Sequence, residues 1–178
     1  LLLTANGQKA DALLLTRERY TSHERLSQGA VILDGSENAS VQYAQCCRPV
    51  PGDSIVGYLG RGEGLVVHTS GCAVAARLKH RDSERFIAVD WADEPVRQFE
   101  TGLVVTVTNR KGVLARVAAD LAQSEVDITK VDMGEEDQQD TTDLRFVISV
   151  RDTAHLDAAL RNLKRTPSVL RAQRITPH

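Results

Sequence analysis

The chain has 178 residues, of which 42% are hydrophobic and 26% are charged, and its formal net charge is −2. This balance is ordinary for globular domains and excludes nucleic-acid or membrane binding driven by bulk charge alone. The apolar runs are far shorter than the roughly 20 residues of a membrane-spanning helix, and no basic-then-apolar leader appears, so we expect a cytoplasmic protein. The only methionine is Met133, which predicts that the chain is a fragment of a longer protein.

The first third of the chain changes character at Ala30. Residues 1–29 keep no helical period and are predicted to be a connector or a short helix that leads into the first domain. The runs Ala30–Leu33 and Ala39–Ala44 have β-like composition and flank Asp34-Gly35. Asp-Gly between two such runs predicts a hairpin, because glycine adopts positive φ without steric cost.

Short elements continue as far as the acidic stretch before Pro95. Ile55–Leu59 and Leu65–His68 flank a glycine-rich turn and predict a second hairpin. The alanine-rich segment Cys72–Leu78 favours a helix, and Arg85–Trp91 is predicted as a closing strand. We therefore expect a small, hairpin-rich α+β domain over residues 30–97.

The second half shows a clearer pattern, predicted as one domain over residues 98–178. Its elements, in chain order, are a strand at Leu103–Thr108, a helix with Val113, Leu114, Val117, Ala118 and Leu121 at helical spacing, a strand at Val126–Met133, a strand with Leu144, Phe146, Ile148 and Val150 on one face, a helix with Leu156, Ala159, Leu160 and Leu163 in one stripe, and a strand at Val169–Ile175. Asp152 or Thr153 can cap the second helix, and Pro167 blocks its extension. The order β-α-β-β-α-β predicts a ferredoxin-like fold.

Three stretches give the chain a resemblance to a known family. They are Tyr43–Asp53 with its paired cysteines and the following Ile-Val-Gly-Tyr, Gly60–Cys72 with its His-Thr-Ser-Gly-Cys, and the β-α-β-β-α-β run with Asn109–Leu114 in the place of Asp-Arg-x-Gly-Leu-Leu. Together they resemble the C-terminal half of long RelA/SpoT-family (p)ppGpp synthetases and hydrolases. The resemblance implies a zinc-finger or ribosome-intersubunit domain followed by an ACT domain, acting in the stringent response.

The catalytic half of that family is not expected in this chain. Its hydrolase needs a His-Asp metal motif, and no histidine here precedes an aspartate. No P-loop or nucleophile elbow is present either. The fragment is therefore not expected to be an enzyme, while the resemblance implies a parent that is a GTP pyrophosphokinase, a (p)ppGpp hydrolase or both.

Four side chains form a candidate metal site. They are Cys46, Cys47, His68 and Cys72. Four such ligands suit a closed structural zinc site. Adjacent residues on an extended strand point to opposite faces, so the cysteine pair would have to lie in a turn to meet one ion. The alternative is that small apolar cysteines and a hydrogen-bonded histidine pack a core.

The turn after the first strand of the second domain is a candidate ligand site. Free N–H groups at a helix N-terminus attract carboxylates, and a glycine lets a ligand approach the backbone. The resemblance implies that ACT domains pair as homodimers and hold ligands between this turn and the second strand of a neighbour, with branched-chain amino acids as the expected class. The candidate residues are Asn109, Arg110, Lys111, Gly112, Val113, Leu114, Asp127, Ile128 and Thr129. The alternative is a plain strand–helix turn without a ligand.

Three functions are consistent with these observations. The first is a regulatory tail that senses amino acids, or responds to a ribosome or protein partner, and controls upstream catalytic domains. The second is a ribosome or RNA docking module without a small-molecule ligand. The third is the ACT tail of an amino-acid biosynthetic enzyme, against which the Cys-Cys-Arg-Pro and His-Thr-Ser-Gly-Cys stretches argue.

Overall fold

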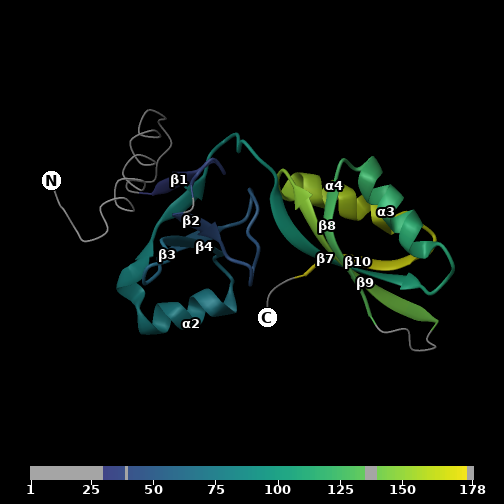
Figure 1. The fold of residues 1–178 in the computed structure, drawn as a ribbon, viewed down its shortest axis with the longest axis horizontal. Coiled ribbons are helices and arrows are strands. Elements are labelled where there is room, and N and C mark those ends of the chain that lie inside the picture. The colour runs from purple at the N-terminus through teal and green to yellow at the C-terminus, as the bar shows by residue number, and fades with distance from the viewer. Residues whose placement is uncertain (1–29, 39, 135–139, 176–178) are drawn as a thin grey trace. The chain divides into compact units, whose positions relative to one another are not determined.

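The computed structural model describes residues 30–38, 40–134 and 140–175, and these form two compact units (Figure 1). The first unit is chiefly residues 30–97 and the second chiefly residues 98–175. The predicted connector at residues 1–29 lies outside the described residues. None of the described helices is long and apolar enough to cross a membrane.

The first unit is built from short strands and one helix. Its elements are β1 (Val31–Leu33), β2 (Val41–Tyr43), β3 (Ile55–Leu59), β4 (Leu65–Thr69), α2 (Ala73–Arg81), the 3-10 turn η1 (Ser83–Arg85), β5 (Phe86–Ile87) and β6 (Val89–Trp91). One sheet has the order β2-β4-β3-β5, and β1 pairs with β6 in a separate two-stranded sheet. β3 and β4 form the predicted hairpin, with Ile55 opposite Thr69 and Leu59 opposite Leu65.

Alternation along β3 and β4 places apolar side chains on both faces of the larger sheet. One face packs against β1 and β6, in a core cluster that includes Leu33, Leu65 and Val89. The other face packs against α2, in a cluster that includes Ala75 and Val66. The sheet is therefore covered on both sides, and the cysteines belong to the cluster on the α2 side.

Two sequence predictions for this unit need correction. β1 and β2 do not form a hairpin around Asp34-Gly35, because β1 pairs in parallel with β6 and β2 pairs in parallel with β4. The Glu37 carboxylate instead accepts hydrogen bonds from the N–H groups of Asp34 and Gly35, which closes a local loop. The closing strand at 85–91 is also split, since β5 joins the larger sheet and β6 the smaller one.

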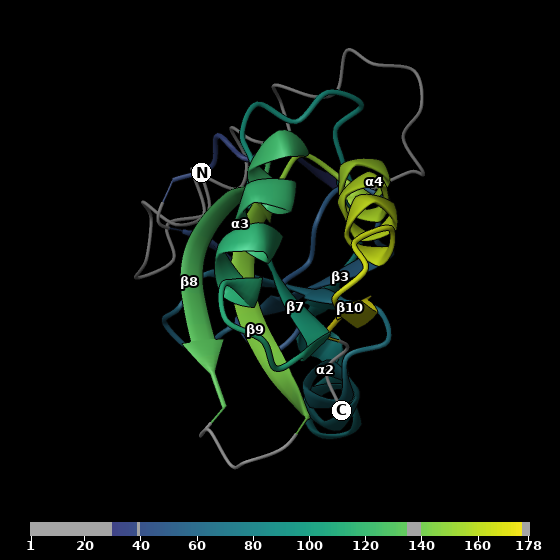
Figure 2. The ribbon, with the colours of Figure 1, turned by 90° about the vertical axis from the view of Figure 1, so that its right-hand side faces the viewer.

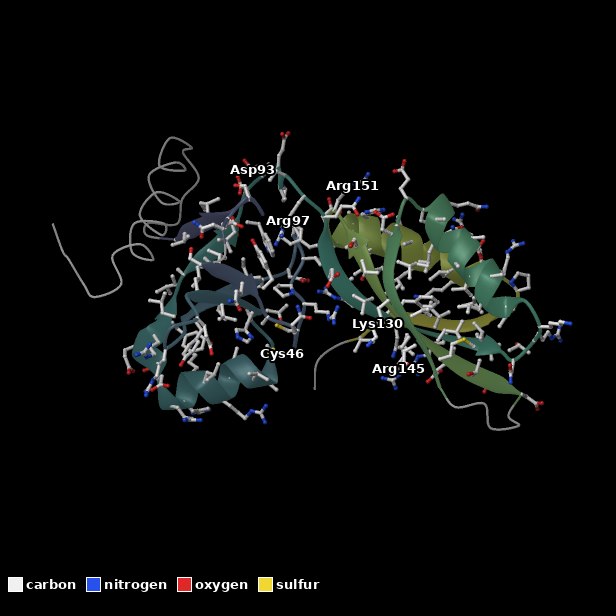
Figure 3. The ribbon with its side chains drawn as sticks, in the orientation of Figure 1. Cys46, Asp93, Arg97, Lys130, Arg145 and Arg151 are labelled. Atoms are coloured by element: carbon white, nitrogen blue, oxygen red, sulfur yellow. The ribbon has the colours of Figure 1, made fainter. Side chains whose placement is uncertain are left out.

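Trp91 packs within the first unit. Its ring stacks on Tyr43 with centroids 5.7 Å apart, and the Arg97 guanidinium lies over Tyr43 at 5.1 Å from the ring centroid. The Trp91 indole N–H donates to the Asp53 carbonyl at 3.0 Å. The chain is thus held to this unit as far as Arg97, labelled in Figure 3.

The second unit has the predicted β-α-β-β-α-β order. Its elements are β7 (Phe99–Thr108), α3 (Val113–Gln123), β8 (Asp127–Met133), β9 (Thr141–Val150), α4 (Thr153–Lys164) and β10 (Val169–Arg174). The strand order is β10-β7-β9-β8, and all neighbouring strands are antiparallel. This is the ferredoxin-like arrangement, so the α+β prediction is confirmed.

Both helices of the second unit cover the same face of its sheet (Figure 2). Leu103, Val105 and Phe146 point into this layer and are at most 1% exposed. Val117 of α3 and Leu163 of α4 are fully buried against them. Each such side chain contributes roughly 1.5–3 kcal/mol by leaving water, so this core determines the fold.

Candidate metal centre and ligand-binding turn

The structure brings the four predicted metal ligands together. Their ligand atoms all lie within 4.8 Å of one another, on Cys46, Cys47, His68 and Cys72. The ligands come from three places: the turn after β2, the strand β4 and the residue that begins α2. Cys46 is exposed and is labelled in Figure 3, whereas Cys47, His68 and Cys72 are at most 4% exposed.

The geometric difficulty of the adjacent cysteines is resolved by a tight turn. β2 ends at Tyr43, and the Arg48 N–H donates to the Ala44 carbonyl at 2.8 Å. Arg48 adopts a φ of 43°, in the left-handed region. Cys46 and Cys47 therefore lie on a curled backbone rather than on an extended strand, and both thiols can face one point.

Four of the six distances between the ligand atoms of the cluster are close to those of a tetrahedron. A zinc ion with ordinary bond lengths would set sulfur atoms about 3.8 Å apart and a sulfur about 3.6 Å from a nitrogen. The Cys46 Sγ lies 3.9 Å from the Cys47 Sγ and 3.6 Å from the Cys72 Sγ. The His68 Nδ1 lies 3.4 Å from the Cys46 Sγ and 3.7 Å from the Cys47 Sγ. The two remaining pairs also lie within 4.8 Å, so the four residues are close enough to share one tetrahedral ion.

Backbone donors and burial set the electrostatics of the cluster. The Thr69 N–H donates to the Cys47 Sγ at 3.3 Å, but burial still raises the pKa of the Cys47 thiol. Although the Cys46 residue is exposed, partial burial of its thiol by the neighbouring side chains raises its pKa to about 12, with a contribution from its hydrogen bond to Cys72. Burial lowers the pKa of His68, so its ring is held in the neutral form that binds metals. Without an ion, two of the thiols thus remain protonated at neutral pH.

Cys72 differs from the other two cysteines because it is the N-cap residue of α2. Burial raises the pKa of its thiol. The N–H groups of Ala75 and Val74 and the Cys46 side chain together lower this pKa by more than burial raises it, so the net shift is downward. The start of the helix therefore favours the thiolate form of Cys72, as expected for an anion near a helix N-terminus.

The predicted ligand turn lies between β7 and α3. Gly112 is the N-cap of α3 with a φ of 84°, and a methyl group added to it would meet no atom within 4 Å. Asn109, Arg110 and Lys111 are exposed, Leu114 is half-buried, and Val113 is buried at 8% exposure. The N-terminus of α3 thus opens to solvent, while Val113 belongs to the core.

The other half of the predicted ligand site lies at the far end of the sheet. Asp127, at the start of β8, pairs with Ser149 of β9, whereas Thr108, next to the turn, pairs with Thr141. Eight residues along β9 separate these positions, which is roughly 27 Å at about 3.4 Å per residue. One copy of the domain therefore does not bring Asp127, Ile128 and Thr129 to its own turn.

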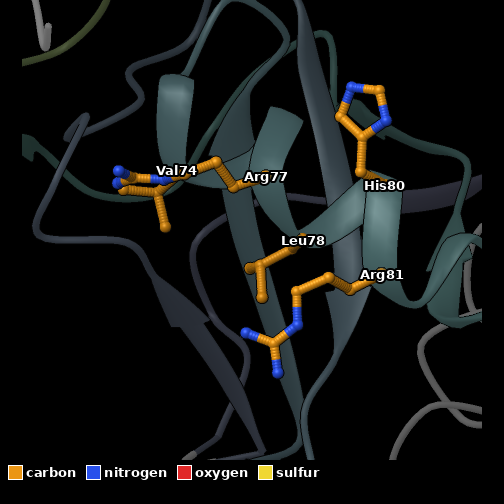
Figure 4. Close-up of a pocket in the computed structure, with 5 residues that line it drawn as sticks. All are labelled: Val74, Arg77, Leu78, His80 and Arg81. Carbon is orange, nitrogen blue, oxygen red and sulfur yellow. The ribbon is translucent and has the colours of Figure 1, made fainter.

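A surface feature that the sequence predictions missed lies on α2 (Figure 4). A depression of about 450 Å³ is lined by Val74, Arg77, Leu78, His80 and Arg81. Val74, Leu78 and Arg81 recur at helical spacing, so the sequence did carry a signal for it. Its cationic side chains are exposed and suit an anionic surface.

Comparison with known proteins agrees with this two-domain organisation. Residues 31–92 match the RelA/SpoT RIS domain, and residues 95–174 match the ACT domain. The bifunctional (p)ppGpp synthase/hydrolase SpoT of Escherichia coli (strain K12) is 30% identical over 149 residues, which cover 83% of this chain and 21% of that protein. GTP pyrophosphokinase of the same strain is 29% identical over 174 residues, which cover 97% of this chain and 23% of that protein.

The chain spans about a fifth of the length of these curated relatives. Among solved structures, the ACT domain from GTP pyrophosphokinase of Chlorobium tepidum aligns with a TM-score of 0.39 and 15% identity, covering 44% of this chain and 99% of that one.

Proposed function

Because the chain belongs to the RelA/SpoT family, with the RIS and ACT domains of its C-terminal regulatory region, we propose that it controls (p)ppGpp synthesis or hydrolysis by the catalytic domains of a longer protein. The parent would be a GTP pyrophosphokinase, a (p)ppGpp hydrolase or both. In this proposal the ACT domain binds an amino acid, with branched-chain amino acids as the class to test first. The RIS match argues against the tail of an amino-acid biosynthetic enzyme.

The observation that carries the sensing proposal is the edge strand β8. All of its residues are exposed, and Ile128, Val131 and Met133 remain 37%, 44% and 43% exposed. These three pair with inward-facing residues of β9, so they lie on the helix side of the sheet. An exposed apolar edge strand favours pairing with another strand. A second copy of the domain is the partner we propose.

Pairing of two β8 strands would complete the ligand site. In an antiparallel pair centred on Lys130, Asp127 of one copy lies opposite Met133 of the other. Met133 is at the same end of the sheet as the Gly112 turn, since it pairs with Leu144 while Thr108 pairs with Thr141. The second copy would thus bring Asp127–Thr129 to the turn, where the α3 N-terminus can receive a carboxylate.

The expected regulation is graded. An amino acid at ten times its dissociation constant stabilises the bound state by about 1.4 kcal/mol. That free energy moves an equilibrium by roughly tenfold, which is less than an all-or-none response requires. A larger partner would therefore have to act together with the amino acid if control of the parent enzyme is tight.

Calorimetry with valine and leucine tests the ligand, with aspartate as the control amino acid. We expect heat from the branched-chain amino acids and a loss of both dimer and binding in Val131→Lys. Val96→Lys, at another exposed valine, is the matched control. Absence of heat for valine and leucine with the folded chain would refute sensing, and unchanged valine binding by monomeric Val131→Lys would refute the shared site.

We also propose that zinc is the ion of the cysteine cluster, held by Cys46, Cys47, His68 and Cys72. When bound, it would cross-link the turn after β2, the strand β4 and the start of α2. The tetrahedral distances support this proposal over packing alone. Metal analysis of the untreated protein should find about one equivalent, and less than about a tenth would leave only the packing interpretation.

Docking to ribosomal RNA is the second candidate function, and the depression on α2 favours it. α2 has no acidic residue in its first turn and carries Lys79, His80 and Arg81 in its last turn. We expect the double substitution Arg77→Glu/Arg81→Glu to weaken co-sedimentation with ribosomes, with Arg61→Glu in the same domain as the control. Binding that survives this charge reversal would exclude α2 as the docking surface.

A further inference from the structure

The cysteine cluster exposes one thiol and buries the other two. We propose that Cys46 is an oxidation site, where a hydroperoxide drives the formation of a disulfide with Cys72 in competition with metal binding. The competition rests on the proposed metal centre, whereas the disulfide depends only on the cysteines themselves. The proposal gives the cluster a role as a modification site in addition to a structural one.

Exposure determines which thiol a peroxide meets first. Cys46 is exposed, whereas Cys47 is 4% and Cys72 0% exposed. A peroxide in solution can reach only the exposed Cys46 sulfur of the three, so access places the first oxidation at Cys46. His68 flanks the Cys46 sulfur at 3.4 Å on the buried side.

Distance determines which cysteine completes the disulfide. The Cys72 Sγ is 3.6 Å from the Cys46 Sγ, so an approach of about 1.5 Å reaches the length of a disulfide bond. The Cys47 Sγ is farther away at 3.9 Å and accepts the Thr69 N–H. A disulfide between adjacent residues is also disfavoured by disulfide geometry. Cys72 is therefore the preferred partner.

Formation of the Cys46–Cys72 disulfide needs no oxidant other than the hydroperoxide. The Cys46 sulfur attacks the peroxide as the thiol gives up its proton, the O–O bond breaks, and the leaving oxygen takes up that proton as an alcohol or water, so that Cys46 becomes a sulfenic acid. The Cys72 thiolate then attacks the Cys46 sulfur, the S–S bond forms, and the S–O bond breaks to release water after protonation. Two thiols lose two electrons in total, and the peroxide gains them.

The placement of Cys72 favours the second step. Cys72 is the N-cap of α2, so its sulfur is close to the helix N-terminus, where a negative charge is favoured. An ion that holds both thiolates would be lost on oxidation, since a disulfide sulfur is no longer an anionic ligand.

The first experiment treats the metal-free chain with hydrogen peroxide and locates the linkage by peptide mass mapping. We expect a loss of two hydrogens within one chain and a bond between Cys46 and Cys72. Cys47→Ser should still form this bond, and Cys72→Ser should stop at the sulfenic acid. A disulfide through Cys47, a disulfide between chains, or sulfinic acid at Cys46 without a disulfide would overturn the proposal.

The second experiment oxidises the zinc-loaded chain and measures released zinc with a metallochromic indicator. We expect bound zinc to fall from about one equivalent to below about a tenth as the disulfide forms, and to return after reduction and zinc addition. Zinc that stays bound after disulfide formation contradicts the competition. If the chain does not bind zinc at all, the proposed metal centre is wrong. The first experiment still tests whether the disulfide forms.

Discussion

Replacement of Cys46 by serine is the most direct perturbation of the proposed metal centre. Cys46 is the exposed member of the cluster, so the change removes one ligand with the least disturbance of the core. Its sulfur lies 3.4–3.9 Å from the other three ligand atoms, as a shared tetrahedron requires. We therefore expect zinc binding to weaken while the metal-free fold stays intact.

The expected loss can be given a magnitude. Removal of a residue that merely supports a ligand weakens metal binding by roughly 10–100-fold, so removal of the ligand itself should cost at least about 100-fold. A 100-fold loss of affinity corresponds to about 2.7 kcal/mol of zinc-dependent stability when zinc is in excess. In the presence of a chelator, Cys46→Ser and the wild type should unfold with nearly the same free energy.

Trp91 provides the assay, because it is the only tryptophan and belongs to the first domain. Urea unfolding followed by its fluorescence, with zinc and with a chelator, separates the two contributions. His80→Ala is the matched control, since His80 is an exposed histidine outside the cluster. If zinc stabilises Cys46→Ser as much as it stabilises the wild type, the four-ligand centre is wrong.

Three further predictions concern stability. Gly64→Ala should destabilise the first domain by at least about 2 kcal/mol in Trp91 fluorescence, because Gly64 has a φ of 82° and an added Cβ would lie 2.2 Å from the Ser40 carbonyl oxygen. In the metal-free chain the free energy of unfolding of the first domain, measured by the same fluorescence, should fall as the pH falls below about 6.5. Burial lowers the pKa of His68 in the folded state, so the unfolded state binds more protons in this pH range. Asp152→Ala should cost the second domain about 1 kcal/mol in circular-dichroism melts, because its carboxylate accepts the His155 N–H at 2.7 Å.

Each of these predictions has a contrasting measurement. In Gly62→Ala the added methyl group meets no neighbour within 4 Å, at a similar φ of 101°. Its loss of stability should therefore be smaller than that of Gly64→Ala and should measure the backbone strain without the clash. Asp157→Ala changes an exposed acid within α4 and should leave the melting temperature nearly unchanged. A stability of the metal-free first domain that is flat between pH 7 and pH 5 would contradict the argument for His68.

The second domain was predictable because local signals and tertiary structure agree there. Leu144, Phe146 and Ile148 alternate along β9 and are all buried, as their spacing predicts. Asp152 acts as the expected N-cap of α4. Each element of this domain packs one apolar face on its neighbours, and such faces can be recognised from periodicity alone.

The first domain was harder to predict because its pairings are long-range. The Asp34-Gly35 signal is satisfied by the Glu37 carboxylate rather than by a partner strand. Parallel pairing of β2 with β4 connects segments more than 20 residues apart, which no local rule specifies. Arg48, which follows the cysteine pair in the tight turn, is likewise a non-glycine residue with no local signal for positive φ.

Cys72 is both a candidate metal ligand and the N-cap of α2, so the ion would set the direction of that helix. Nine residues extend about 13 Å at a rise of about 1.5 Å each. A tilt of about 20° at Cys72 would therefore carry the far end of α2 sideways by roughly 4–5 Å. Arg81 lies at that end of α2, so a small displacement of the Cys72 sulfur would produce a larger displacement of the cationic surface around Arg81.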